Sequence, residues 1–281
     1  MMQVFSETRC ALGEGPLWHP ERKQLFWFDI LGKRLLTVEG GKERYWQFDE
    51  HVSAAGWIDA ETLLMASETG LWRFDIGTGN RELVIALETD NAITRSNDGR
   101  ADARGGFWIG TMGKQAEKHA GAIYRYYRGE LRVIAADITI SNSICFSPDG
   151  SLAYWTDTFG KQIMRQPLDA KTGWPTAKAE LFVDLRAEGL NPDGSVVDAA
   201  GNLWNAQWGA SRVACYDADG NLKTTLECPA SQTSCPAFGG DDLTTLYVTT
   251  AADGLKEETA AGKTYSLQTM HKGQPEHRVI L

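Results

Sequence analysis

The chain has 281 residues, of which 42% are hydrophobic and 23% charged, and its formal net charge is −9. This acidic balance, without a lysine and arginine cluster that could follow a phosphate backbone, argues against nucleic acid as a partner. No apolar run approaches the roughly 20 residues that cross a bilayer, and the first residues do not resemble a secretory signal. We therefore expect a cytoplasmic protein that does not bind membranes.

Five cysteines occur, an odd number, and no two form a C-x-x-C pair. This pattern predicts buried thiols rather than a disulfide framework or a zinc ribbon. A disulfide between Cys228 and Cys235 is the alternative if the protein resides in an oxidising compartment.

Six segments share one form, in which an apolar stretch, a turn and a second apolar or aromatic stretch follow one another. Their turns, such as SPDG and DAAG, consist of residues that tolerate tight backbone bends. In chain order the segments are residues 15–30, 54–67, 99–111, 143–157, 194–207 and 236–250.

A large side chain in the second stretch of each segment recurs every 38 to 50 residues. Each interval leaves room for about four short strands, which is typical of one propeller blade. We therefore predict an all-β, six-bladed β-propeller that forms a single domain over residues 1–281. A pair of β-sandwiches, the alternative, would not need this period. The recurring residues are Phe26, Leu64, Trp108, Tyr154, Trp204 and Tyr247.

Polar residues recur at one phase of this repeat, 11 or 12 positions before each large side chain. The first strand of a propeller blade lines the central channel, so these residues should surround it. Converging carboxylates repel one another unless a cation neutralises them, and oxygen ligands suit Ca²⁺, Mg²⁺ or Mn²⁺. The residues at this phase are Glu14, Ser53, Asn97, Asn142, Asp193 and Cys235.

Each of these polar residues could instead be an ordinary turn residue. For Asp193 this is disfavoured, because DAAG, with Asp198, already supplies the hairpin turn of its repeat. The histidines offer no HExxH or HxH pair, and no GxSxG elbow is present. His19 is expected in an exposed hairpin turn, and His51 either faces the channel or belongs to a plain loop.

Four motifs, in order over nearly the whole chain, resemble the regucalcin/gluconolactonase-type (senescence marker protein-like) sugar lactonase family. They are LGEGPLW (12–18), RSNDGRADARGGFWIGTM (95–112), ISNSICFSPDG (140–150) and NPDGSVVDAAGNLWNAQW (191–208). The resemblance implies a propeller with one divalent cation, Ca²⁺, Zn²⁺, Mn²⁺ or Fe²⁺, bound by Glu14, Asn142 and Asp193. It also implies that Arg95 and Asn97 contact the substrate.

The sequence departs from the family pattern at two positions. Ser143 follows the metal-binding asparagine, where relatives often have glycine. An acidic substrate contact that some relatives have falls on Gln115 by strict count, with Glu117 two residues later. We name Glu117 as the candidate contact.

The resemblance implies hydrolysis of an aldonolactone to the aldonate. The metal would polarise the carbonyl, and Asp193 would assist the attacking water. Asp98 is expected to brace the NDG loop, and Asp157 is either a structural strand-end residue or a support of the site. A calcium-dependent phosphotriesterase or arylesterase-type propeller and a non-catalytic calcium-binding protein remain alternatives. The expected partner is a small sugar lactone, and the expected oligomeric state is a monomer.

Overall fold

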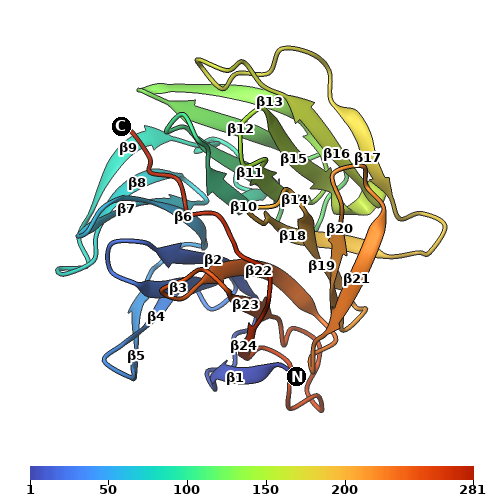
Figure 1. The fold of residues 1–281 in the computed structure, drawn as a ribbon. Coiled ribbons are helices and arrows are strands. Elements are labelled where there is room, and N and C mark those ends of the chain that lie inside the picture. Colours follow the sequence, from blue (N-terminus) through green and yellow to red (C-terminus); the bar gives the residue numbers. More distant parts are fainter.

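The computed structural model describes residues 1–281 as 24 strands and one 3-10 helix, η1 (Thr158–Gly160). The strands form six four-stranded antiparallel sheets, which are arranged as blades around a central channel (Figure 1). The six-bladed β-propeller predicted from the sequence is confirmed.

The first five blades each use four consecutive strands, ordered from the channel outwards. Blade 1 contains β2 (Gly13–His19), β3 (Gln24–Asp29), β4 (Arg34–Glu39) and β5 (Lys42–Gln47); blade 2 contains β6 (Val52–Asp59), β7 (Thr62–Ser67), β8 (Gly70–Asp75) and β9 (Arg81–Ala86); blade 3 contains β10 (Thr94–Ala101), β11 (Phe107–Gly113), β12 (Gly121–Tyr127) and β13 (Glu130–Ile138). Blade 4 contains β14 (Ser141–Phe146), β15 (Leu152–Asp157), β16 (Gln162–Pro167) and β17 (Glu180–Asp184); blade 5 contains β18 (Asn191–Val197), β19 (Leu203–Trp208), β20 (Arg212–Tyr216) and β21 (Leu222–Glu227).

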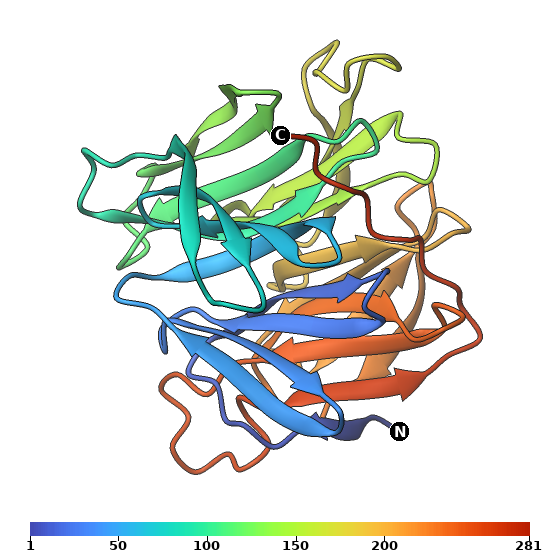
Figure 2. The same cartoon turned by 90° about the vertical axis from the view of Figure 1, so that its left-hand side faces the viewer.

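Blade 6 closes the ring with strands from both ends of the chain. It contains β22 (Thr233–Gly239), β23 (Thr245–Thr250) and β24 (Thr264–Gln268), and β1 (Gln3–Ser6) pairs antiparallel with β24 as its outermost strand. Figure 2 shows this N-terminal strand beside the last strands of the chain. The pairing fixes the circular arrangement through ordinary sheet hydrogen bonds.

Six apolar clusters fill the interfaces between neighbouring blades. Trp204 of blade 5, for example, packs with Phe238 of blade 6 at a ring-centroid distance of 6.0 Å. All six large side chains that defined the sequence repeat are buried. The repeat therefore exists because each blade must cover its neighbour's apolar face.

Each innermost strand has a register shift at or beside the phase-matched polar residue. In β18, for example, the shift lies between Pro192 and Ser195, on either side of Asp193. A β-bulge re-aims side chains and ends regular pairing. The bulges therefore redirect one side chain per blade at the same level of the channel.

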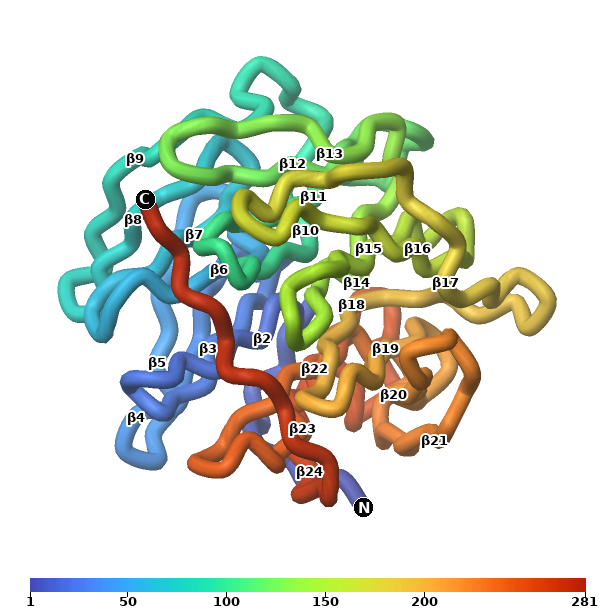
Figure 3. The backbone as a smooth tube through the Cα atoms, turned by 45° about the horizontal axis from the view of Figure 1, so that its top comes forward, coloured from blue at the N-terminus to red at the C-terminus, as the bar shows by residue number.

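The residues after β24 cross the channel at the end where the innermost strands finish, and they reach blades 2 and 3 (Figure 3). Gln274 donates to the carbonyls of Phe146 and Val197, at 3.1 and 3.0 Å. Glu276 forms an ion pair with Arg100, and the Val279 amide donates to the Trp57 carbonyl at 2.9 Å. We call residues 272–281 the C-terminal tail.

Two further expectations can be compared with the structure. All five cysteines are free and buried, so Cys228 and Cys235 do not pair. The expected exposure of His19 is wrong: it ends β2, is fully buried, and contacts the Asp59 carbonyl through Nε2 at 3.0 Å. The turn begins only after it. No helix is long and apolar enough to cross a membrane.

Candidate functional site

A cavity of about 740 Å³ opens at the end of the channel away from the C-terminal tail. Its lining combines residues from the innermost strands of four blades with loop residues above them. The structure brings five of the six sequence-predicted site residues together in this lining: Glu14, Arg95, Asn97, Asn142 and Asp193.

The three predicted metal ligands come from different blades and are almost completely buried. Glu14 belongs to β2, Asn142 to β14 and Asp193 to β18. Asn142 donates its amide hydrogen to the Thr158 hydroxyl at 2.9 Å, which orients the amide. Each ligand thus sits on a strand that the propeller core holds rigidly.

The two ligand carboxylates are electrostatically unfavourable where they stand. Burial raises the pKa of Glu14 to about 8, and the charge of Asp98 adds to this effect. Burial also raises the pKa of Asp193 well above its usual range, and Glu14 and Asp98 raise it further. A bound cation would favour both ionised forms.

The donor set fits a hard divalent cation. Two carboxylates and one carboxamide offer only oxygen ligands, which is the chemistry that Ca²⁺ and related ions prefer. Neither Glu14 nor Asp193 forms an ion pair with a basic side chain of the chain.

Arg95 and Asn97 form the adjoining part of the wall. Nη1 of Arg95 donates to the Asn97 side-chain oxygen at 2.7 Å, and Asn97 donates through Nδ2 to the Asn142 side-chain oxygen at 3.1 Å. Arg95 is 5% exposed and its Nε has no partner. Hydrogen bonds thus link Asn142 through Asn97 to Arg95, and the Nε of this buried arginine still lacks an acceptor.

Ser143 supports Asp193 across the boundary between blades 4 and 5. Its hydroxyl donates to the Asp193 backbone carbonyl at 2.5 Å. The backbone of Ser143 is left-handed, with φ of 59°, a conformation that glycine adopts without strain. Sequence reasoning noticed the serine but not this supporting role.

Asp98 and Asp157 both accept hydrogen bonds from backbone amides of neighbouring segments. Asp98 accepts a hydrogen bond from the Ile144 amide at 2.7 Å, so it braces β10 against β14, as expected. Asp157 accepts from the amides of Thr139 and Ile140 at 2.9 and 3.0 Å, and it also caps η1. These contacts agree with a strand-end role for Asp157.

Glu117 is the one candidate that the structure does not bring to the cavity. Its carboxylate accepts from the Gln115 amide at 3.0 Å and so folds back onto its own loop, while Gln115 itself lines the cavity. The strict motif count thus leads to the residue that lines the cavity, whereas the candidate chosen for its acidic side chain, Glu117, lies outside the lining.

Other residues of the lining escaped notice in the sequence. Lys114 follows β11 directly, and Trp208 ends β19. Both lie at the end of a motif stretch already identified, beside GTM and within NAQW. Their position next to the motifs was the available signal, but strand direction was needed to place them at the cavity.

The chain matches the family model described as "SMP-30/Gluconolactonase/LRE-like region" over residues 12–252. A sugar lactone lactonase assigned in Rhizobium meliloti is 40% identical over 279 residues, which cover 97% of this chain and 95% of that protein. The L-arabinolactonase of Azospirillum brasilense is 35% identical, covering 96% of this chain and 92% of its own length.

Solved structures include a similar propeller. The calcium-binding protein regucalcin from Agrobacterium tumefaciens superposes with a TM-score of 0.98 at 42% identity, covering 100% of this chain and 98% of its own. The similarity extends over both the ring of blades and the strands that carry the cavity residues.

Proposed function

The chain belongs to the SMP-30/gluconolactonase/LRE-like family, and from this premise we propose that it is a divalent-cation-dependent hydrolase of sugar-acid lactones. The observation that carries the proposal is the single cavity that joins Glu14, Asn142 and Asp193 with Arg95 and Asn97. It offers a cation site and sugar-binding groups within one small-molecule pocket.

We assign the cation to Glu14, Asn142 and Asp193. Once bound there, a divalent cation supplies Lewis-acid polarisation of the lactone carbonyl. Ca²⁺, Zn²⁺, Mn²⁺ and Fe²⁺ remain the candidates, and the regucalcin similarity makes Ca²⁺ the first to test.

The residues of the chain perform the remaining work. Water attacks the carbonyl carbon while its proton passes to the Asp193 carboxylate, which acts as general base. The ester bond between the carbonyl carbon and the ring oxygen then breaks, and the ring oxygen takes up the proton that Asp193 accepted and becomes the new hydroxyl. Arg95 and Asn97 hold sugar oxygens, so that the carbonyl carbon faces Asp193.

The cellular setting is part of the proposal. Five free, buried thiols suit the reducing cytoplasm. A propeller closed by its own terminal strands needs no partner chain, so we propose a monomer. The acidic net charge disfavours nucleic acid as a partner.

A hydrolysis screen tests the proposal. The chelated protein, reloaded with one cation at a time, is assayed with several aldonolactones by a pH indicator and, in parallel, with an aryl ester and a phosphotriester. We expect hydrolysis of at least one aldonolactone that is lost on chelation while the fold persists. Ester or phosphotriester turnover alone would favour the arylesterase alternative, and calcium binding without any turnover would favour a non-catalytic role.

A further inference from the structure

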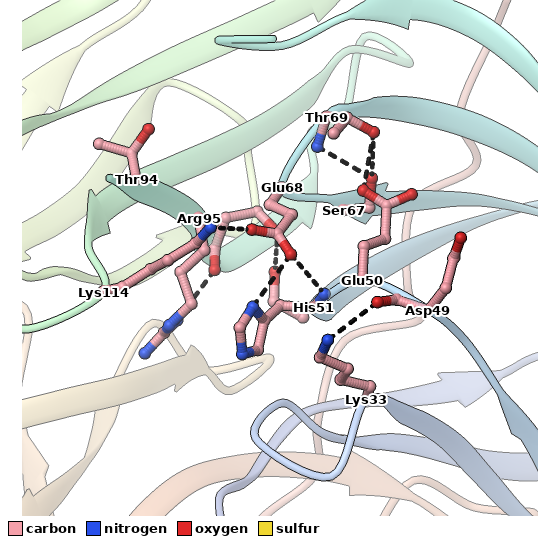
Figure 4. A network of polar contacts seen from close by, with 12 residues as sticks. Lys33, Asp49, Glu50, His51, Ser67, Glu68, Thr69, Thr94, Arg95 and Lys114 are labelled. Atoms are coloured by element: carbon pink, nitrogen blue, oxygen red, sulfur yellow. Dashed lines mark hydrogen bonds and ion pairs between the residues drawn. The ribbon is translucent and has the colours of Figure 1, made fainter. Parts of the chain in front are cut away.

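The Glu68 carboxylate joins two blades beside the cavity (Figure 4). One oxygen accepts from the backbone amide of His51 and lies 3.1 Å from His51 Nδ1, and the other is ion-paired with the Lys114 ammonium. Glu68 follows β7 in blade 2, whereas Lys114 follows β11 in blade 3 and lines the cavity. One carboxylate therefore fixes groups from both blades.

Arg95 lies within this arrangement. Figure 4 shows its guanidinium beside the His51 imidazole, with both groups directed to the same side, and the Lys114 chain next to them. Burial lowers the pKa of Arg95 to about 10, and the negative charges of Glu14 and then of Glu68 oppose this effect. Arg95 and Lys114 line the cavity and His51 does not, so Glu68 anchors one lining residue, Lys114, and one residue outside the lining, His51. We call Arg95 and Lys114, with the neighbouring Gln115, the polar wall.

The polar wall combines donors with an acceptor. Arg95 and Lys114 only donate. Glu117 is turned onto its own loop, so the side-chain oxygen of Gln115 is the acceptor that lines the cavity next to Lys114.

We propose that Glu68 is a positioning residue, which sets the preference for polyhydroxylated lactones by holding Lys114 beside Arg95 in the polar wall. The proposal rests on the lactonase function proposed above and deepens it. Neighbouring sugar hydroxyls each need a donor and an acceptor, and the polar wall provides both at a fixed spacing. A lactone without hydroxyls cannot use the polar wall and gains nothing from it.

The proposal is tested with two lactones, one with hydroxyls and one without, and with replacements of two largely buried carboxylates, Glu68 and Glu50. Steady-state kinetics of cation-loaded Glu68→Ala and Glu68→Gln would be measured with an aldonolactone and with γ-butyrolactone, which has the ring but no hydroxyls. Glu50→Ala is the control: Glu50 is also largely buried and pairs with Arg81 at 2.6 Å, but it does not line the cavity.

We expect Glu68→Ala to raise KM for the aldonolactone roughly tenfold or more, as for a lost charge-assisted contact. Its kcat/KM for γ-butyrolactone should stay within about twofold of wild type, since a few tenths of a kcal/mol is typical of a neutral site. Glu68→Gln, which keeps the hydrogen-bond acceptor towards His51, should recover part of the loss. Glu50→Ala should leave both substrates unaffected.

Equal losses on both substrates, or equal behaviour of the Glu68 and Glu50 variants, would overturn the positioning role and leave the lactonase function intact. A wild-type protein that hydrolyses neither lactone with any cation would overturn the proposed function and the positioning role with it.

Discussion

At one end of the channel, Glu14 and Asp193 are buried without a basic side chain paired to either. At the other end, the side chain of the partly buried Glu276 is paired with Arg100, and its backbone carbonyl accepts from the Trp57 indole at 2.8 Å. The same innermost strands run through both ends, and β10 contributes Arg95 to the first and Arg100 to the second.

The difference separates stability from function. Buried charges that serve the fold are paired and hydrogen-bonded, because leaving one unpaired is strongly destabilising. Buried charges that remain unpaired mark a site that needs a ligand. Removing a charge at the cavity end should therefore lower activity with little loss of stability. Removing a charge at the tail end should lower stability with little loss of activity.

The largest expected effect is on activity at the cavity end. Asp193→Asn removes the proposed base and one cation ligand, so we expect kcat to fall by about 10³-fold or more, judged from the usual size of base catalysis. The metal-free variant should unfold at the same or a higher temperature than metal-free wild type, because the repulsion with Glu14 is relieved. Kinetics and thermal unfolding of the same sample provide both readouts.

Two results would contradict this prediction. Near-wild-type turnover would remove Asp193 from the mechanism. A large loss of stability in the metal-free state would show that the cavity end, like the tail end, depends on its charges for folding.

The second effect is on stability at the tail end. Glu276→Ala leaves Arg100 as a buried charge without its partner, and we expect a loss of about 3–5 kcal/mol in the free energy of unfolding. Urea denaturation measures this loss. Turnover per folded molecule should stay close to wild type, since Glu276 does not line the cavity.

The double replacement Glu276→Met with Arg100→Met is the matched control, because removing both charges avoids the unpaired one. It should recover most of the lost stability. If Glu276→Ala is neutral, or if it abolishes turnover in folded protein, the two ends are not separated as we describe.

The features that could be predicted from the sequence are those that recur in every blade. The blade period and the six large side chains can be recognised in the sequence because each blade packs against its neighbours in the same way. The phase of the polar residues also distinguished two aspartates that are only five residues apart, Asp193 and Asp198. Asp198 accepts from the Asn202 amide at 2.9 Å within its turn, whereas Asp193 lines the cavity.

Contacts between segments of different blades were out of reach. The Glu68 anchor joins residues 51, 68 and 114, and no spacing rule relates them. The turn of Glu117 away from the cavity depends on the local backbone of a loop, not on the motif count. The exposure of His19 was predicted wrongly because it is the last residue of a strand, where contacts with Asp59 and Trp57 of blade 2 decide burial.

The smallest effect is a pH dependence at the tail end, where His19 is buried as a neutral ring. Nδ1 accepts from the Arg22 amide at 3.3 Å and Nε2 therefore donates to the Asp59 carbonyl, so a second ring proton has no acceptor. Burial lowers the pKa of His19 below its usual 6.5. Between the folded and unfolded pKa values the unfolded chain binds more protons, so stability falls as the pH falls through that window.

His19→Gln can still donate to Asp59 but cannot titrate. The variant should therefore lose less stability than wild type when the pH is lowered from 7.5 to 5, by about 1.4 kcal/mol for each unit by which the pKa of His19 is lowered. Urea unfolding at a series of pH values measures the slope, and the exposed His119→Gln is the matched control. Identical slopes for wild type and His19→Gln would mean that the ring takes up its proton without cost, and that the tail end lacks the closed packing by which we distinguish it from the cavity end.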